Sequence, residues 1–227
     1  MITYEELLQE LTTHADEGYR AFMQKSIKDD NVHVLGVRTP VLRTIAKKYR
    51  EEWRTIFSFP NNWYEVTIVK CGLAGYLTYP ELCGQIDGLV AMLNNWATCD
   101  GLAPGCIAKH REEFLDYVDR YLTDERVFVR RFALTTLLHF YVDEQFVPEV
   151  TRRLRRVRAE EYYVSMAAAW LAAEVIIKFR DAGVALLREH ALDRTTHNRT
   201  IRKACESLRL SAGEKEQLRA LRRPVIQ

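Results

Sequence analysis

The stretch TDERVFVRRFALTTLLHFYVDE, residues 123–144, contains the pattern that decides the fold. It opens on the polar turn Thr123-Asp124-Glu125 and closes on Val142-Asp143-Glu144. Between these turns the apolar residues recur at helical spacing, which predicts a helix over about 125–140. Short links make neighbouring helices antiparallel, so the stretch predicts one member of a series of stacked helix pairs.

The same helical spacing runs along most of the chain, and no stretch reads as a convincing strand. An all-α protein is therefore expected, and one helix should begin with Thr39 as its N-cap and Pro40 at the first helical position. We expect helices over about residues 3–12, 15–26, 41–53, 62–78, 80–94, 96–108, 111–122, 125–140, 144–157, 159–178, 181–190, 196–208 and 212–222.

Two architectures are compatible with this series of helices, an α-solenoid with a concave groove and a helical bundle. We favour the solenoid because only one segment, Val164 to Ile177, is apolar on nearly all sides. A groove also explains why arginines recur at the same place in successive helix pairs. We expect one domain over residues 1–227, in which the N-terminal helices, about residues 1–60, cap the repeats.

Length and composition describe a compact protein that needs neither a disulfide nor a metal. A chain of 227 residues buries roughly 70 to 75% of the surface that its unfolded form exposes. The five cysteines are odd in number and show no zinc-ligand spacing, so we interpret them as buried thiols in a reducing compartment. An acidic N-terminus and the lack of an apolar run of ~20 residues predict a cytoplasmic protein without a membrane segment.

Charge is distributed unevenly along the chain, although the net charge is only +2. Residues 1–125 hold 13 Lys and Arg against 19 Asp and Glu, a net −6, whereas residues 126–227 hold 20 against 12, a net +8. A polyanion is the natural partner of such a basic half. Solvated helix faces are the simpler interpretation of any single basic run.

Several enzyme classes are set aside because their motifs are missing. The chain has no Walker A loop, no GxGxxG turn after a strand, no GxSxG elbow and no HExxH helix. The six histidines are dispersed without metal-ligand spacing, so neither a metal nor a cofactor is expected. His139 lies in an apolar helix, and we interpret it as a core histidine.

The sequence Asn95-Trp96-Ala97-Thr98-Cys99-Asp100 places an aromatic ring and a carboxylate four positions apart. On a helix both would project from the same face, which is an unusual pair for a core stripe. We therefore take Trp96 and Asp100 as the leading functional pair. The alternatives are a capping carboxylate at Asp100, and core packing for Trp96 and Trp170.

Four stretches in this order and spacing resemble the HEAT-repeat DNA alkylation repair family, of the AlkD-like type: residues 35–40 (LGVRTP), 95–100 (NWATCD), 124–131 (DERVFVRR) and 162–170 (YYVSMAAAW). The resemblance implies a HEAT-like solenoid with a basic concave groove that holds duplex DNA. It also implies a DNA-alkylpurine glycosylase, a hydrolase that excises positively charged bases such as 7-methylguanine and 3-methyladenine without a metal.

Carried over by position, the resemblance makes Asp100 the catalytic carboxylate, and Trp96 and Trp170 the aromatics that flank the deoxyribose of the lesion. It makes Arg130 a phosphate-binding arginine, and it puts Phe22 where glycosylases often carry a tyrosine. Arg130 and its neighbour Arg131 cannot share one helix face, and position favours Arg130. The full set of expected DNA-binding residues is Arg130, Phe22, Arg38, Arg131, Arg199, Arg202 and Lys203.

One departure from the family pattern bears on activity. One turn beyond Trp170, where glycosylases of this family place a DNA-contacting arginine, the chain has Ala173. A non-catalytic DNA-binding member of the same family therefore remains an alternative. A protein-binding HEAT-repeat scaffold is the alternative from another class, because stacked helix pairs offer concave surfaces to peptides as well. We expect a monomer, since a groove for duplex DNA requires no partner subunit.

Overall fold

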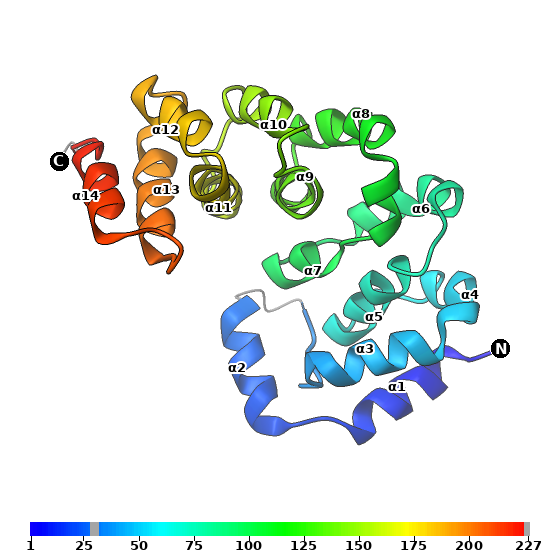
Figure 1. Ribbon diagram of the computed structural model, residues 1–227. Coiled ribbons are helices and arrows are strands. Elements are labelled where there is room, and N and C mark those ends of the chain that lie inside the picture. The colour runs from blue at the N-terminus through cyan, green and yellow to red at the C-terminus, as the bar shows by residue number, and fades with distance from the viewer. Residues whose placement is uncertain (28–31, 225–227) are drawn as a thin grey trace. The chain divides into compact units, whose positions relative to one another are not determined.

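The computed structural model describes residues 1–27 and 32–224. The chain divides into two compact units, Met1–His110 and Arg111–Gln227, and Figure 1 shows that both consist of helices. Over the described residues there is no strand, only an isolated bridge between His33 and Trp63. The expected all-α class is confirmed, whereas the single domain with capping helices over about 1–60 stays a prediction.

The N-terminal unit is built around α5, which packs against α3, α4, α6 and α7. Glu10 ties α1 to the end of α3, because its carboxylate accepts hydrogen bonds from Lys48 at 2.8 Å and from the Tyr49 hydroxyl at 2.6 Å. The elements of this unit are α1 (Tyr4–Thr13), α2 (Glu17–Ile27), α3 (Thr39–Lys48), η1 (Arg50–Glu52), α4 (Trp53–Phe57), α5 (Tyr64–Ala74), α6 (Tyr79–Ala91), α7 (Trp96–Gly101) and η2 (Gly105–Lys109).

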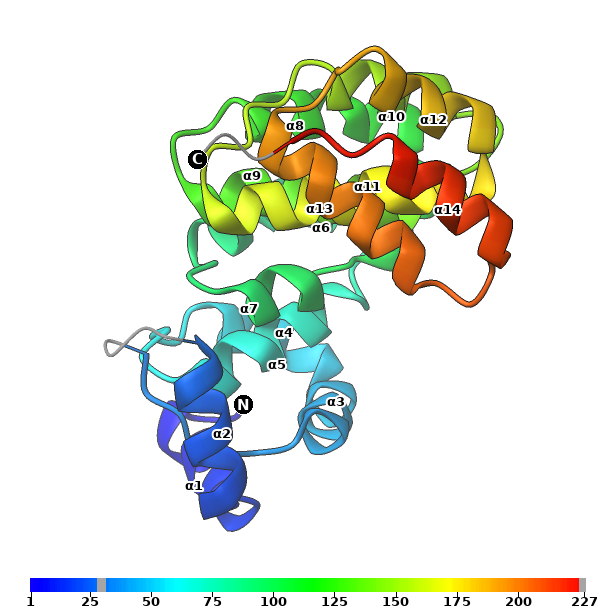
Figure 2. The same ribbon diagram turned by 90° about the vertical axis from the view of Figure 1, so that its left-hand side faces the viewer.

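The C-terminal unit is a stack of helix pairs in two rows. Its helices are α8 (Arg111–Leu122), α9 (Val127–Phe140), α10 (Val147–Leu154), α11 (Tyr162–Lys178), α12 (Arg180–Arg188), α13 (Arg194–Glu206) and α14 (Ala212–Ala220). Helices α8, α10 and α12 form one row, and α9, α11 and α13 form the other (Figures 1 and 2). The expected helical-repeat, solenoid-like fold is confirmed. The expected concave basic groove stays a prediction.

Most of the expected helix boundaries are shifted by a few residues, and the differences at α3, α4 and α7 have a clear local origin. The helix expected over 41–53 ends at Lys48, and α4 follows as a separate short helix. The helix expected over 96–108 ends at Gly101, because Pro104 disfavours helical backbone in the residue before it. Thr39 is not the N-cap of α3: the cap is Arg38, in extended backbone, and Pro40 lies in the first turn.

A buried carboxylate holds the loop that precedes α3. Glu65 on α5 is fully buried, and its oxygens accept hydrogen bonds from the backbone N–H groups of Leu35 at 3.0 Å, Gly36 at 2.8 Å and Val37 at 3.3 Å. Gly36 has a φ of +91°, and a Cβ there would lie 2.3 Å from the Asp16 carbonyl oxygen. The LGVRTP stretch is therefore a loop folded around an internal anion.

A second buried charge on α5 holds the loop that follows α4. The Lys70 ammonium donates to the carbonyl oxygens of Phe57 and Phe59 and, at 2.7 Å, to Asn61 Oδ1. Burial lowers the pKa of Lys70 to about 8, because an apolar surrounding disfavours the charged form. Opposite charges, one near the start of α5 and one in its middle, thus fix two loops to one helix.

Replacement of Glu65 should test this anchoring. Glu65→Gln removes the charge and turns an NH₂ group toward backbone donors, so we expect it to lower the free energy of unfolding by about 2–4 kcal/mol. Chemical denaturation checks this, with Glu5→Gln as the control. Glu5 is exposed in the first turn of α1, and its replacement should cost less than about 1 kcal/mol. Equal, small losses in both variants would show that the loop does not depend on the carboxylate.

Candidate functional site

Asn95 is the N-cap residue of helix α7. The Asn95 side chain is buried, and its Oδ1 accepts hydrogen bonds from the backbone N–H groups of Ala97 at 2.9 Å and Thr98 at 3.1 Å. The Thr98 hydroxyl donates back to the Asn95 carbonyl oxygen at 3.0 Å. A helix of six residues has few internal hydrogen bonds, so this cap decides where it begins.

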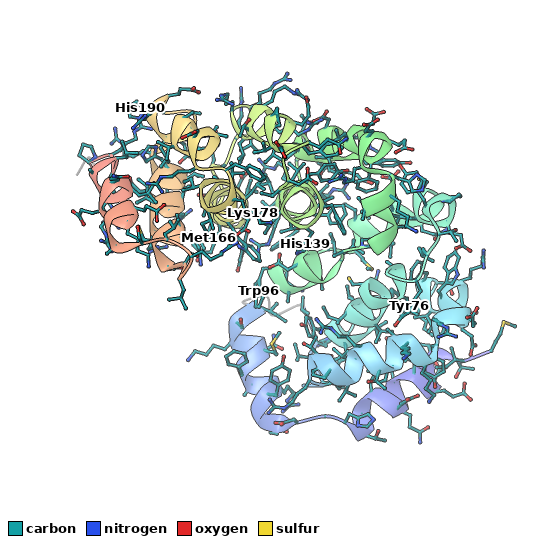
Figure 3. The ribbon with its side chains drawn as sticks, viewed as in Figure 1. Tyr76, Trp96, His139, Met166, Lys178 and His190 are labelled. Carbon is teal, nitrogen blue, oxygen red and sulfur yellow. The ribbon has the colours of Figure 1, made fainter. Side chains whose placement is uncertain are left out.

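Trp96 is the first residue of α7 (Figure 3), and Asp100 follows it by one turn. Both side chains are partly buried, and the Trp96 indole N–H points to the Ser26 carbonyl oxygen on α2 at 3.4 Å. The N-cap of α7 is Asn95, so Asp100 does not cap the start of this helix. The structure keeps the ring and the carboxylate on one short helix, as the sequence predicts.

The contacts of α7 with its neighbours limit its movement. Ala97 packs against an apolar cluster that includes Met23 and Ile27 of α2 and Tyr64 of α5. The Cys71 thiol of α5 lies 3.5 Å from the Thr98 carbonyl oxygen. Residues on both sides of α7 therefore hold Trp96 and Asp100 in place within the N-terminal unit.

Two further expected residues of this unit meet at one aromatic ring. The Phe22 side chain is 63% exposed and stacks on Tyr19 with 6.1 Å between ring centroids. The Arg38 guanidinium lies 4.9 Å from the centroid of the Tyr19 ring and pairs with Asp16 at 2.9 Å. Phe22 of α2 and Arg38, the N-cap of α3, thus contact the same Tyr19 ring, although Arg38 already has a carboxylate partner.

In the C-terminal unit, Arg130 is held by an acid. Its guanidinium, 12% exposed, forms an ion pair with Glu161 just before α11, and the Arg130 side chain lowers the pKa of Glu161. Because the pKa is lowered, the pair stabilises the fold above the usual glutamate pKa and loses this contribution as the pH falls through the lowered value. Over the described residues, Arg130 Nε and Glu161 Oε2 are buried without a hydrogen-bond partner.

The Arg131 side chain is buried in the protein interior. It is only 6% exposed, and its guanidinium donates to the Tyr163 carbonyl oxygen at 3.0 Å. A buried guanidinium with a backbone acceptor is not available to a phosphate, so we leave Arg131 out of the DNA-contacting set. The two neighbouring arginines both face protein partners, which the sequence did not indicate.

Trp170 and Ala173 differ sharply in environment although both lie on α11. The Trp170 ring is 40% exposed, so it is not a core residue. Ala173 is 2% exposed and packs in a cluster with Ile176, Leu187 and Ile201. An arginine side chain would not fit at this packed position.

The three remaining expected contacts lie on α13. Arg199 donates to the Ser165 hydroxyl at 2.6 Å, and its guanidinium lies 4.9 Å from the centroid of the Tyr162 ring. Arg202 is exposed, whereas Lys203 pairs with Glu206 at 3.1 Å. Of these basic groups, Arg202 is the most accessible to an anion.

The family model for the DNA alkylation repair enzyme matches residues 7–208. The chain belongs to this family of DNA alkylation repair enzymes. Comparison with curated proteins found no match. Membership in the family supports an enzyme of DNA repair with DNA as its substrate.

The described residues offer neither a metal-binding cluster nor a membrane-spanning helix. Among the described residues, no group of three or more His, Cys, Asp or Glu side chains could hold a metal ion. No helix in the described part of the chain is long and apolar enough to cross a membrane. His139, near the end of α9 (Figure 3), is exposed. Its interpretation as a core histidine is wrong, because the buried stretch of α9 ends at Leu137.

Three residues that contact the candidate site residues were given no role from the sequence: Asn95, Glu161 and Tyr162. Asn95 could have been found as an N-cap residue immediately before the Trp96 helix. Glu161 and Tyr162 had no such signal, because their partners, Arg130 and Arg199, lie 31 and 37 positions away in the sequence. Only the fold brings these pairs together.

Loss of the Asn95 cap should loosen α7 specifically. Asn95→Ala removes the acceptor for two N–H groups, and we expect it to lower the stability of α7 by about 1–2 kcal/mol. Hydrogen exchange of the segment 96–102 should therefore become about 5- to 30-fold faster. Asn95→Asp, which keeps an acceptor oxygen, is the control and should retain most of the protection. Unchanged exchange in Asn95→Ala would show that packing on α5 alone fixes the helix.

Proposed function

We propose that this repair protein is a DNA glycosylase that hydrolyses the N-glycosidic bond of positively charged alkylated purines, such as 7-methylguanine and 3-methyladenine, in duplex DNA. The single observation that carries the proposal is the pair Trp96 and Asp100 on α7, whose start is fixed by Asn95. Membership in the DNA alkylation repair family supports it.

The chemistry requires a negative charge near the sugar more than a strong acid. When the N-glycosidic bond breaks, its electron pair stays with the cationic base, which leaves neutral, and the positive charge moves to the deoxyribose. Water then adds to C1′ and releases a proton to solvent, which leaves an abasic site. In this proposal Asp100 stabilises the sugar cation and orients the water. A carboxylate about 4 Å from a positive centre contributes on the order of 4 kcal/mol at an effective dielectric of 20.

Aromatic rings provide a second, smaller contribution. The faces of Trp96 and Trp170 carry negative electron density, and each would stabilise a cationic sugar by about 0.5–2 kcal/mol. Trp170 suits this role because its ring is 40% exposed on α11, which leaves a face for a ligand. Because the carboxylate contributes more than either ring, Asp100 should be the most sensitive position.

Binding to the duplex is assigned to basic and aromatic side chains that are exposed or half-buried. The proposed contacts are Phe22, Arg38, Arg199, Arg202 and Lys203. Arg130 is added to them on the condition that it leaves its present partner. Arg130 is held by Glu161, so it can bind a phosphate only by exchanging one anion for another. In this proposal, Glu161 keeps the Arg130 guanidinium paired until DNA arrives.

Removal of the Asp100 charge should separate catalysis from binding. We expect Asp100→Asn to slow release of 7-methylguanine and 3-methyladenine from methylated duplex DNA by about 100-fold or more, with duplex affinity changed less than about twofold. The control is Asp116→Asn, an exposed carboxylate on α8, which should change neither. If binding falls in step with release, Asp100 is a structural residue and the assignment fails.

The same assay distinguishes the alternatives when run on the wild-type protein. No release, together with duplex affinity that falls steeply with salt, would indicate a non-catalytic DNA-binding member of the family. Loss of both properties would indicate a protein-binding helical repeat. Metal chelation should not affect release, since the proposed chemistry uses none.

A double-mutant cycle should reveal whether Arg130 reaches DNA. Glu161→Gln frees the Arg130 guanidinium, so we expect tighter binding to any duplex and a plot of log affinity against log salt steeper by up to about 0.9. Arg130→Ala should weaken binding, and Glu161→Gln should have no effect in that background. Fluorescence anisotropy with an undamaged duplex gives these values. No response to Glu161→Gln in the wild-type background would place Arg130 outside the DNA contact.

A further inference from the structure

The C-terminal unit contains a cavity of about 680 Å³ lined mainly by arginines. It lies where the start of α11 meets α13 and the segment after α14. Its basic lining residues are Arg194, Arg199, Arg202, Arg222 and Arg223, and no acidic side chain lines it. The exposed Tyr162 ring completes one wall.

Most of these guanidinium groups have no counter-ion. Within residues 1–27 and 32–224, the side chains of Arg194, Arg202 and Arg222 form no ion pair or hydrogen bond, and the Arg194 Nε atom is buried without a partner. Some other arginines of the same unit are neutralised by a carboxylate: Arg155 pairs with Glu189 at 2.9 Å, and Arg209 pairs with Glu174 at 2.6 Å. Three guanidinium groups without a carboxylate partner therefore line one cavity.

The walls of the cavity are fixed before any ligand arrives. Arg199 is held between the Ser165 hydroxyl at 2.6 Å and the Tyr162 ring. The Asn198 side chain donates to the Arg223 carbonyl oxygen at 2.8 Å and accepts from the Arg223 backbone N–H at 3.0 Å. These bonds fasten the segment after α14 to α13, so like charges are kept close together although they repel.

A cavity of this kind requires an anion with several oxygen atoms. The planar guanidinium fork matches phosphate oxygens in a bidentate manner, which an ammonium group cannot do. The volume admits more than one phosphate group. The exposed Tyr162 ring offers a flat apolar surface beside the charges, which suits a sugar or a base between phosphates.

We infer that this cavity binds two neighbouring phosphates of one DNA strand, independently of any lesion. The inference rests on the proposed function, because the family acts on DNA, and it adds Arg194 and Arg222 to the contacts considered above. A site that reads only the backbone holds the protein on undamaged DNA, and specificity for the lesion remains with Trp96, Asp100 and Trp170.

The test compares two triple variants that remove equal charge from the same unit. The cavity variant is Arg194→Gln/Arg202→Gln/Arg222→Gln. The control variant is Arg188→Gln/Lys215→Gln/Arg219→Gln, in which all three positions lie outside the cavity lining. Affinity for an undamaged duplex is measured by fluorescence anisotropy over a range of salt concentrations, after circular dichroism confirms that both variants are folded.

We expect the cavity variant to bind at least 10-fold more weakly at low salt, with a slope of log affinity against log salt shallower by about 1.8, which corresponds to two phosphates. The control variant should stay within about threefold of the wild type, with its slope changed by less than about 0.5. Should the triple variant fail to fold, Arg202→Gln and Arg222→Gln replace exposed residues singly, and each should reduce the slope by up to about 0.9.

Three outcomes would overturn the inference. An unchanged slope in the cavity variant would show that no phosphate is bound there, and an equal loss in the control variant would show only a general effect of charge. Binding of a poly-glutamate peptide that is lost in the cavity variant, while duplex binding is kept, would assign the cavity to an acidic protein segment. Excision by the wild-type protein is measured in parallel, so failure of the glycosylase proposal is distinguished from failure of this one.

Discussion

The N-terminal unit depends on the carboxylate of Glu65. A fully buried carboxylate without partners would cost several kcal/mol, and three backbone N–H groups of residues 35–37 satisfy this one. The same loop positions α2, because the Asp16 N–H donates to the Gly36 carbonyl oxygen at 3.2 Å. The anchor on α5 therefore fixes the helices before and after the loop. The LGVRTP stretch, which resembles the repair family, therefore has a structural role in this unit: its backbone binds the Glu65 carboxylate.

The short helix α7, which carries Trp96 and Asp100, packs on the same helix, α5. Because Glu65 near the start of α5 and Lys70 in its middle each bind a loop, α5 offers a rigid surface on which α7 packs. Asn95 then sets the first residue of α7, and with it the positions of Trp96 and Asp100. A carboxylate that stabilises a developing charge must be in place before the bond breaks, since reorganisation would consume the gain. The many contacts around a six-residue helix agree with that requirement.

In the C-terminal unit, arginines of similar appearance in the sequence have different roles. Arg131 supports the backbone of α11, Arg130 is paired with Glu161, and Arg202 has no partner in the described part of the chain. A paired or buried guanidinium contributes to stability, whereas an unpaired one retains its attraction for an external anion. The distribution of carboxylates among the arginines, rather than the number of arginines, decides where positive charge stays unpaired.

The sequence by itself determined the all-α class, the helix pairs and the spacing of Trp96 and Asp100 on one helix, because helical spacing, caps and turns depend on residues close together in the chain. It also contained Pro104, whose effect on the preceding residues should have ended the helix expected over 96–108. Only the tertiary structure decided which arginines are available. The partners of Arg130, Arg131 and Arg199 lie 31, 32 and 34 positions away, and no local pattern encodes a contact over such separations. The availability of a charge depends on what the fold places beside it.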